Sequence, residues 1–231
     1  MGFAGGGTME AALGPHTTVI ASEIDPEVIG EYNTSHDTDF EAKDFLSVDP
    51  SVYKDVDLYH VSPVCKSLSK ANINRKVRKL DIDFAEKIGR DITEGRPRTV
   101  AVENVPEFAT KPELTDPIVQ ALEDGGYTWD VQIHDAADYG AAMNRERMII
   151  RAVREGPLPE LPKKSPPGDW WALVRDLVDA APDAPWSESN KERAGIAKRI
   201  KLFADSGGRR GLDPSKPIIT MGGWAASRNA G

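Results

Sequence analysis

The sequence predicts an α/β fold with a mainly parallel central sheet, plus a small, mostly helical C-terminal region. Two observations predict it. From residue 3 to about residue 154, short apolar runs alternate with helical patterns, as in sheets whose parallel strands are joined by helices. After Glu155 this alternation stops, and seven of the 17 prolines fall within residues 155–185. We therefore expect one domain over residues 1–154 and a smaller region over residues 155–231.

The strands are expected where apolar or β-branched residues run together. Residues 17–22 are β-branched, residues 58–61 and 99–102 are short apolar runs, and the pair 128–134 and 147–153 is expected to leave the mainly parallel sheet. The helices are expected from amphipathic spacing and end signals. Asp25 is placed to cap a helix over 26–32, and Gly125-Gly126 closes one over 117–124. Further helices are expected over 84–93, near 170–180 and near 191–203.

The single cysteine of the chain, Cys65, follows the strand predicted over 58–61. Pro63 ends that strand, so the thiol is expected on a loop at the strand's carboxyl end, where open α/β sheets bind ligands. Glu103 ends the strand over 99–102 and is expected at the same edge. A thiol facing a carboxylic acid is a reactive arrangement. The alternative is a buried cysteine that packs as a small apolar residue.

The composition excludes several classes of protein. One cysteine excludes a disulfide framework, and the four histidines show no metal-ligand spacing, so we expect no metal. No apolar run has membrane-spanning length and no signal-peptide pattern occurs, so an intracellular, cytoplasmic protein without a membrane partner is expected. The net charge of −8 argues against a generally basic nucleic-acid binder, although a local basic face remains compatible with it.

Such a basic face is predicted directly after Cys65. Six cations fall within fourteen residues, with no acidic residue until Asp81: Lys66, Lys70, Arg75, Lys76, Arg78 and Lys79. Their attachment to the predicted nucleophile favours contact with phosphates. The alternative is a solvated charged loop.

A glycine loop at the N-terminus, Gly5-Gly6-Gly7, lets the backbone approach a ligand closely. The third glycine of a dinucleotide fingerprint is missing near Glu10, which disfavours an NAD enzyme. Glu23, eighteen residues after Gly5, is well placed to accept hydrogen bonds from ribose hydroxyls. A tight turn for the glycines, and strand-end solvation or helix capping for Glu23 and Asp44, are the alternatives.

Five segments in order resemble the motifs of the DNA cytosine-5 methyltransferases. They are Phe3-Ala4-Gly5-Gly6-Gly7, Ser22-Glu23-Ile24-Asp25 and Lys43-Asp44-Phe45, then Pro63-Val64-Cys65 with Glu103-Asn104-Val105, then Asp138-Tyr139-Gly140 with Asn144-Arg145-Glu146-Arg147. They span residues 2 to about 153, roughly two-thirds of the chain. The resemblance implies a Rossmann-like S-adenosylmethionine-dependent methyltransferase fold, double-stranded DNA as the partner, and a restriction–modification or mobile-element origin.

The resemblance also implies roles for individual residues. Cys65 would attack C6 of a flipped cytosine, Glu103 would hold N3 and the exocyclic amine, Arg147 would bind O2, and Arg145 would support it or a neighbouring phosphate. S-adenosylmethionine would be bound by Phe3, Gly5, Gly7, Glu23, Ile24, Asp44 and Pro63. A mobile loop closing over the DNA would carry Lys66, Ser67, Ser69, Lys70 and Arg75.

The chain departs from the family pattern at a few positions. Val64 stands where the family usually has proline, Lys66 replaces a common glutamine, and Met143 replaces a glutamine before Asn144. Only residues 221–231 follow a segment that in the family precedes a returning C-terminal helix, so we expect a chain that is incomplete, compact or completed by a second polypeptide. Two other functions stay open: methylation of RNA, and a cofactor-binding subunit that is inactive alone.

Overall fold

The computed structural model describes residues 1–5, 7–13, 18–64, 67–68, 76–169, 172 and 218–219. Two compact units are present: unit 1 comprises Met1–His134 with Glu146–Leu161, and unit 2 comprises Asp135–Arg145 with Pro162–Gly231. The helices expected near 170–180 and 191–203 lie outside the described residues, apart from residue 172. No helix in the described part of the chain combines the length and apolar character needed to cross a membrane.

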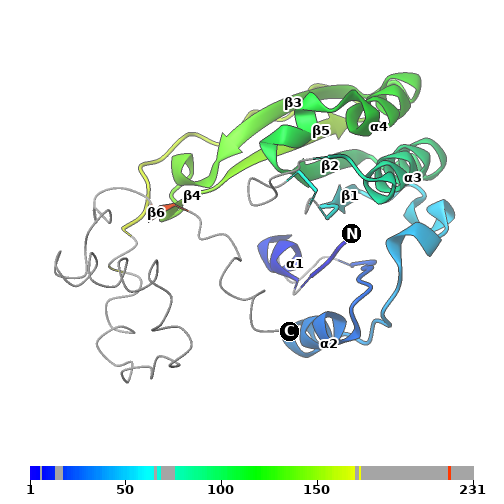
Figure 1. Ribbon diagram of the computed structural model, residues 1–231, viewed down its shortest axis with the longest axis horizontal. Coiled ribbons are helices and arrows are strands. Elements are labelled where there is room, and N and C mark those ends of the chain that lie inside the picture. Colours follow the sequence, from blue (N-terminus) through cyan, green and yellow to red (C-terminus); the bar gives the residue numbers. More distant parts are fainter. Residues whose placement is uncertain are drawn as a thin grey trace. The chain divides into compact units, whose positions relative to one another are not determined.

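Unit 1 is built on a four-stranded sheet in the order β1 (Leu58–Val61), β2 (Thr99–Asn104), β5 (Glu146–Val153) and β3 (Thr128–Asp135) (Figure 1). Strands β1 and β2 are parallel, whereas β2 and β5 are antiparallel. The α/β fold is confirmed as a mixed sheet, in which β3 and β5 are the strand pair that leaves the parallel part.

The parallel part continues on the other side of β1 through isolated bridges. Gly2 pairs in parallel with both Val61 and Ser22. The prediction of a strand over 17–22 is wrong for residues 18–22, the part that the structure describes. Only the bridge at Ser22 forms there. Regular strand pairing ends after Gly2, since Phe3 adopts a φ of 60°, which is incompatible with extended pairing. The Ala4 N–H nevertheless donates to the Ser22 carbonyl at 3.0 Å.

Two helices, α3 (Lys79–Gly95) and α4 (Pro112–Asp124), lie side by side against one face of the sheet (Figure 1). Their apolar residues share one buried cluster with the inward side chains of the strands: Phe84, Ile88, Ile92, Leu114, Ile118, Leu122, Val100, Val102, Met148 and Ile150. Helix α4 begins at Pro112 and contains Pro117, so the expected start at residue 117 is wrong. The two helices approach closely there, because a Cβ on Gly89 would lie 2.5 Å from the Pro117 carbonyl oxygen.

The other helices in the described part of unit 1 are α1 (Thr8–Leu13), α2 (Pro26–His36) and the 3₁₀ turns η1 (Phe45–Ser47), η2 (Pro50–Tyr53) and η3 (Pro106–Thr110). Helix α2 confirms the predicted cap: Asp25 Oδ1 accepts hydrogen bonds from the N–H groups of Glu27 and Val28, at 2.9 and 3.4 Å. Its C-terminus is closed by Asp37 in the left-handed conformation.

Unit 2 contains η4 (Ala136–Asp138) and a two-stranded parallel sheet of β4 (Met143–Asn144) and β6 (Ile218–Ile219). Asp135 ties its first segment together: Oδ1 accepts from the backbone N–H of Arg145 at 2.8 Å, and Oδ2 accepts from Asn144 Nδ2 at 2.8 Å. The segment 135–145 therefore belongs structurally with unit 2, whereas residues 146–161 belong with unit 1.

Candidate active site

The parallel pair β1 and β2 brings two of the predicted motifs to one edge of the sheet. The register aligns Val61 with Val102, so the residues that follow, Ser62 and Glu103, emerge beside each other at the carboxyl end. Ligands of open α/β sheets bind at this edge. The pairing of Gly2 with Val61 and Ser22 places the start of the glycine loop at the same end of the neighbouring parallel segment.

Asn104 fastens the segment that leads to Cys65. Its side chain is only 2% exposed, its Nδ2 donates to the Pro63 carbonyl at 3.0 Å, and its Oδ1 accepts from the Val105 N–H at 2.9 Å. A buried amide satisfied at both ends is well fixed, because breaking either bond leaves an unpaired polar group in the core. Pro63 is therefore held against the end of β2.

Glu103 lies in the middle of a hydrogen-bonded group at this edge. Its Oε1 is 2.7 Å from Nε of Arg147, and its Oε2 accepts a hydrogen bond from Oγ of Ser62. The antiparallel register pairs Glu103 with Ile149, which puts Arg147 on the same face of the sheet one step further along β5. The carboxylate and the guanidinium are 26% and 25% exposed, so a ligand can reach both.

His60 is a half-buried neighbour of this group on β1. Burial lowers its pKa below the ordinary value of 6.5, the N-terminal amine lowers it further, and the charge of Glu103 raises it. The imidazole is therefore neutral at pH 7. The positive charge facing Glu103 from the sheet comes from Arg147.

A second polar group links the glycine loop to Glu23. Glu23 Oε2 accepts from the Gly5 N–H at 3.2 Å, while Oε1 accepts from the N–H groups of Ile24 and Asp25, at 2.9 and 3.2 Å. A carboxylate has about four acceptor positions, so one further donor can be accommodated. Gly5 has a φ of +54° with open space where a Cβ would be, and Ile24 is 65% exposed.

The other residues predicted for the cofactor support this region. Phe3 packs against the rings of Phe45 and Phe84, each with a centroid distance of 4.9 Å. Gly7 has a φ of +82°, and a Cβ there would lie 2.0 Å from Nε2 of His36, so only glycine fits. Asp44 caps η1, because its Oδ1 accepts a hydrogen bond from the Leu46 N–H at 3.0 Å. One of its two carboxylate oxygens therefore has the capping role that was the alternative to cofactor binding.

The predicted nucleophile, Cys65, lies outside the described residues. So do four of the five predicted DNA contacts: Lys66, Ser69, Lys70 and Arg75. Ser67 is 2% exposed and its hydroxyl lies within hydrogen-bonding reach of Asp81, and Arg145 is an exposed residue of unit 2.

Two residues at the site, Ser62 and Asn104, were not predicted from the sequence as site residues. Each adjoins a predicted site residue, and that adjacency is the signal that could have drawn attention to it. What links each of them to the other strand, however, is a contact between residues 41 positions apart.

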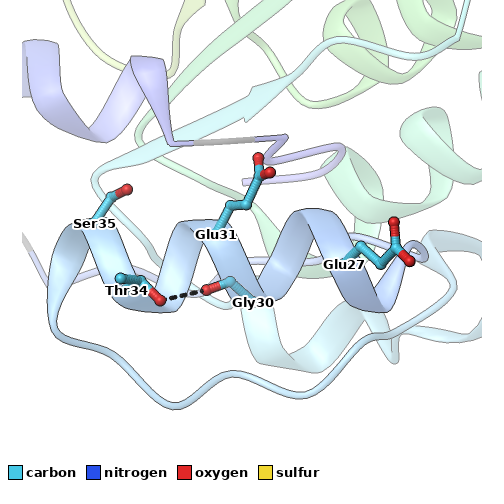
Figure 2. A pocket seen from close by; sticks show the side chains of 5 residues that line it. All are labelled: Glu27, Gly30, Glu31, Thr34 and Ser35. Atoms are coloured by element: carbon cyan, nitrogen blue, oxygen red, sulfur yellow. Dashed lines mark hydrogen bonds between the residues drawn. The ribbon is translucent and has the colours of Figure 1, made fainter.

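A shallow hollow runs along α2 and is lined by Glu27, Gly30, Glu31, Thr34 and Ser35 (Figure 2). The carboxylates of Glu27 and Glu31 would repel a phosphate backbone, so this face does not suit DNA. No group of three or more potential metal-binding side chains occurs within the described residues.

Comparison with known proteins gives the family. The sequence model of the C-5 cytosine-specific DNA methylases matches residues 3–205. The type II methyltransferase M1.HgaI of Avibacterium volantium is 36% identical over 121 residues, covering 47% of this chain and 34% of that protein. M.NlaX of Neisseria lactamica is 25% identical over 192 residues, covering 82% of this chain and 61% of that protein. The chain thus spans between a third and three-fifths of the length of these relatives.

Solved structures agree on the fold. The methyltransferase EhMeth of Entamoeba histolytica matches with a TM-score of 0.61 and 16% identity over 82% of this chain and 60% of that one. The Dnmt2 methyltransferase of S. pombe matches with a TM-score of 0.55 and 17% identity over 83% of this chain and 57% of that one. With a family match over most of its length and a methyltransferase fold, the chain belongs to the C-5 cytosine-specific DNA methylase family.

Proposed function

We propose that this chain transfers a methyl group from S-adenosylmethionine to C5 of cytosine in DNA. The observation that carries the proposal is the pairing of Glu103 with Arg147 beside the segment that leads into Cys65, held there by Asn104. The carboxyl group and the guanidinium lie at one sheet edge beside that segment. Together with the thiol of Cys65 they would supply the three functions that addition to a pyrimidine ring requires.

The proposed cofactor side lies around Glu23. The remaining acceptor position of its carboxylate suits a ribose hydroxyl, the open space before Gly5 lets a ligand approach the backbone, and the exposed Ile24 offers an apolar surface for a base. These residues fit S-adenosylmethionine, which would supply an electrophilic methyl group. Phe3, Gly7, Asp44 and Pro63 would complete the pocket.

The proposed chemistry follows from the electronics of cytosine. C5 is too weak a nucleophile to take a methyl group unaided, so the Cys65 thiolate first adds to C6. Glu103 holds the N3 side of the ring and the exocyclic amine, and Arg147 turns from Glu103 to O2, which stabilises the electron-rich ring. C5 then takes the methyl group, the C5 proton leaves to a base, and the C5–C6 double bond re-forms as the thiolate departs.

The substrate must expose C6, which is inaccessible within stacked duplex DNA, so the target base is flipped out of the helix. The cations between Lys66 and Lys79, together with Ser69, are proposed to contact the phosphates around it. Ser67, predicted from the sequence as a further DNA contact, is only 2% exposed and is not proposed as a phosphate contact. We propose that the chain acts inside the cell, where its DNA substrate is found. If the chain alone is inactive, we propose that a second polypeptide completes it.

The test is incubation of the purified chain with tritium-labelled S-adenosylmethionine and either unmodified duplex DNA or tRNA. Label should appear in DNA and be abolished by Cys65→Ser, which leaves the scaffold intact. Label in tRNA instead would assign an RNA substrate. Label in neither would favour a subunit that depends on a second polypeptide.

A further inference from the structure

Ser62 is the first residue after β1 and lies three positions before Cys65. Its hydroxyl donates across the parallel strand pair to Oε2 of Glu103. The hydrogen bond therefore connects the cysteine-bearing segment directly to the carboxyl group that faces it, rather than to the backbone.

The position of this hydroxyl is fixed from both sides. On one side, Val61 is paired with Val102 in the parallel register. On the other, the carbonyl of Pro63 is bound by the buried Asn104 at 3.0 Å. Because both neighbours of Ser62 are held, its side chain is preorganised toward Glu103, as a group that orients a functional side chain must be.

The geometry points to Ser62 as a positioning residue for Glu103, an inference that rests on the proposed function. Among the described residues Glu103 has two side-chain hydrogen-bond or ion-pair partners, Arg147 on Oε1 and Ser62 on Oε2. When Arg147 turns to O2 of the base, Ser62 is the partner that stays. Its hydroxyl then keeps the plane of the carboxyl group directed at the N3 side of the ring.

Three variants test this role. Ser62→Ala removes the hydroxyl, Ser62→Thr keeps it on a residue that suits the extended backbone before Pro63, and Ser35→Ala is the matched control on the exposed face of α2 (Figure 2). We expect Ser62→Ala to lower kcat for methyl transfer about 10- to 100-fold, the usual effect of losing a hydrogen bond to a charged group. The KM for S-adenosylmethionine should stay within about twofold of wild type, since the hydrogen bond lies on the base side of the site.

Two further results separate positioning from simple support of the fold. Ser62→Thr should restore kcat to within about threefold of wild type, because it restores the donor. Adding Ser62→Ala to Glu103→Gln should cause little further loss, because a residue that acts through Glu103 has no effect once Glu103 is lost. Equal defects in Ser62→Ala and Ser62→Thr, a normal rate for Ser62→Ala, or full additivity with Glu103→Gln would each overturn the inference.

If the wild-type chain labels no DNA, the proposed function fails while the contact itself remains testable. Thermal unfolding of wild type, Ser62→Ala, Glu103→Gln and the double variant then forms a cycle. Coupling between the two residues should appear as a non-additivity of about 2–4 °C in the midpoint. Additive midpoints would show that Ser62 does not hold Glu103.

Discussion

Two ion pairs in unit 1 occupy opposite environments. Lys87 and Asp91 on α3 are 1% and 0% exposed, and Tyr59 donates to the second oxygen of Asp91 at 2.7 Å. The ammonium group of Lys87 also lies 4.9 Å from the ring centroid of Phe45. Glu103 and Arg147, in contrast, are each about a quarter exposed and lie beside the segment that leads to Cys65, the proposed nucleophile.

The difference shows what each pair can do. Charges sealed inside a core cannot exchange partners without a large desolvation cost, so the Lys87–Asp91 pair joins α3 to β1 and gives no access to a ligand. Burial raises the pKa of the Asp91 carboxyl even though Lys87 and Tyr59 stabilise its charged form. The pair at the sheet edge is partly solvated, so either partner can exchange the other for a ligand at modest cost.

The largest expected effect is on the buried pair. Lys87→Met removes the cation and leaves Asp91 buried without its main partner, which should lower the free energy of unfolding by about 3–5 kcal/mol. Urea unfolding followed by circular dichroism measures it. The matched control is Lys79→Met, which breaks an exposed pair with Asp83 and should change stability by less than about 1 kcal/mol. Equal losses in both variants would contradict the comparison.

At the partly exposed Glu103–Arg147 pair, a substitution should affect catalysis more than stability. Glu103→Gln keeps the shape of the side chain, so unfolding should change by under about 1 kcal/mol, while methyl transfer should fall at least about 100-fold. Asp130→Asn is the control, because Asp130 forms a similarly exposed pair with Arg151, at 2.7 Å. Methyl transfer should be unchanged by it. A large loss of stability in Glu103→Gln would mean that this pair too serves the fold.

A substitution on the proposed cofactor side should have a smaller effect, on cofactor binding, that can be separated from the effect of losing Cys65. Glu23→Ala should weaken binding of S-adenosylmethionine by about 1–3 kcal/mol, the cost of losing hydrogen bonds to a charged group. Calorimetric titration measures it. Cys65→Ser should bind the cofactor with nearly wild-type affinity, since its proposed contact is with the base. Equal weakening in the two variants would show that the site is not divided in this way.

The smallest effect concerns pH. The pKa of His60 is lowered from 6.5 by burial and by the N-terminal amine, against Glu103, so below pH 6.5 the unfolded chain binds a proton that the folded chain does not. Stability should therefore fall as the pH drops below 6.5, by at most about 1.4 kcal/mol per pH unit. The N-terminal amine titrates nearby, with its pKa lowered to about 6 by burial. Comparing the pH dependence of wild type with that of His60→Gln isolates the histidine, and identical slopes would contradict the prediction.

Much of the scaffold around the site follows from local sequence. The strand over 58–61 is predicted residue for residue, and Glu103 lies on β2 as expected, because short apolar runs bounded by proline and polar residues leave few alternatives. The cap at Asp25 is likewise a local signal. The strand predicted over 17–22 does not form within its described part, because a strand needs an extended partner and the φ of 60° at Phe3 ends regular pairing after Gly2.

The contacts that distinguish the two ion pairs could not be predicted in this way. Lys87 and Asp91 are spaced i,i+4, which on a helix usually indicates a solvated pair, and only the packing of Tyr59 and Phe45 over them reveals burial. The hydrogen bond from Ser62 to Glu103 depends on the register of two strands distant in sequence. The assignment of residues 1–154 and 155–231 to catalysis and recognition stays a prediction.

The close approach of α3 and α4 has a consequence for engineering. Gly89 lies inside a 17-residue helix, where replacement by alanine ordinarily adds about 1 kcal/mol of stability. Here the added methyl group would lie 2.5 Å from the carbonyl oxygen of Pro117, a backbone atom that cannot swing aside. A substitution chosen from helix propensity alone would therefore force the two helices apart and disturb the buried cluster that they share with β2 and β5. Gly89 is a residue to leave untouched when this protein is stabilised.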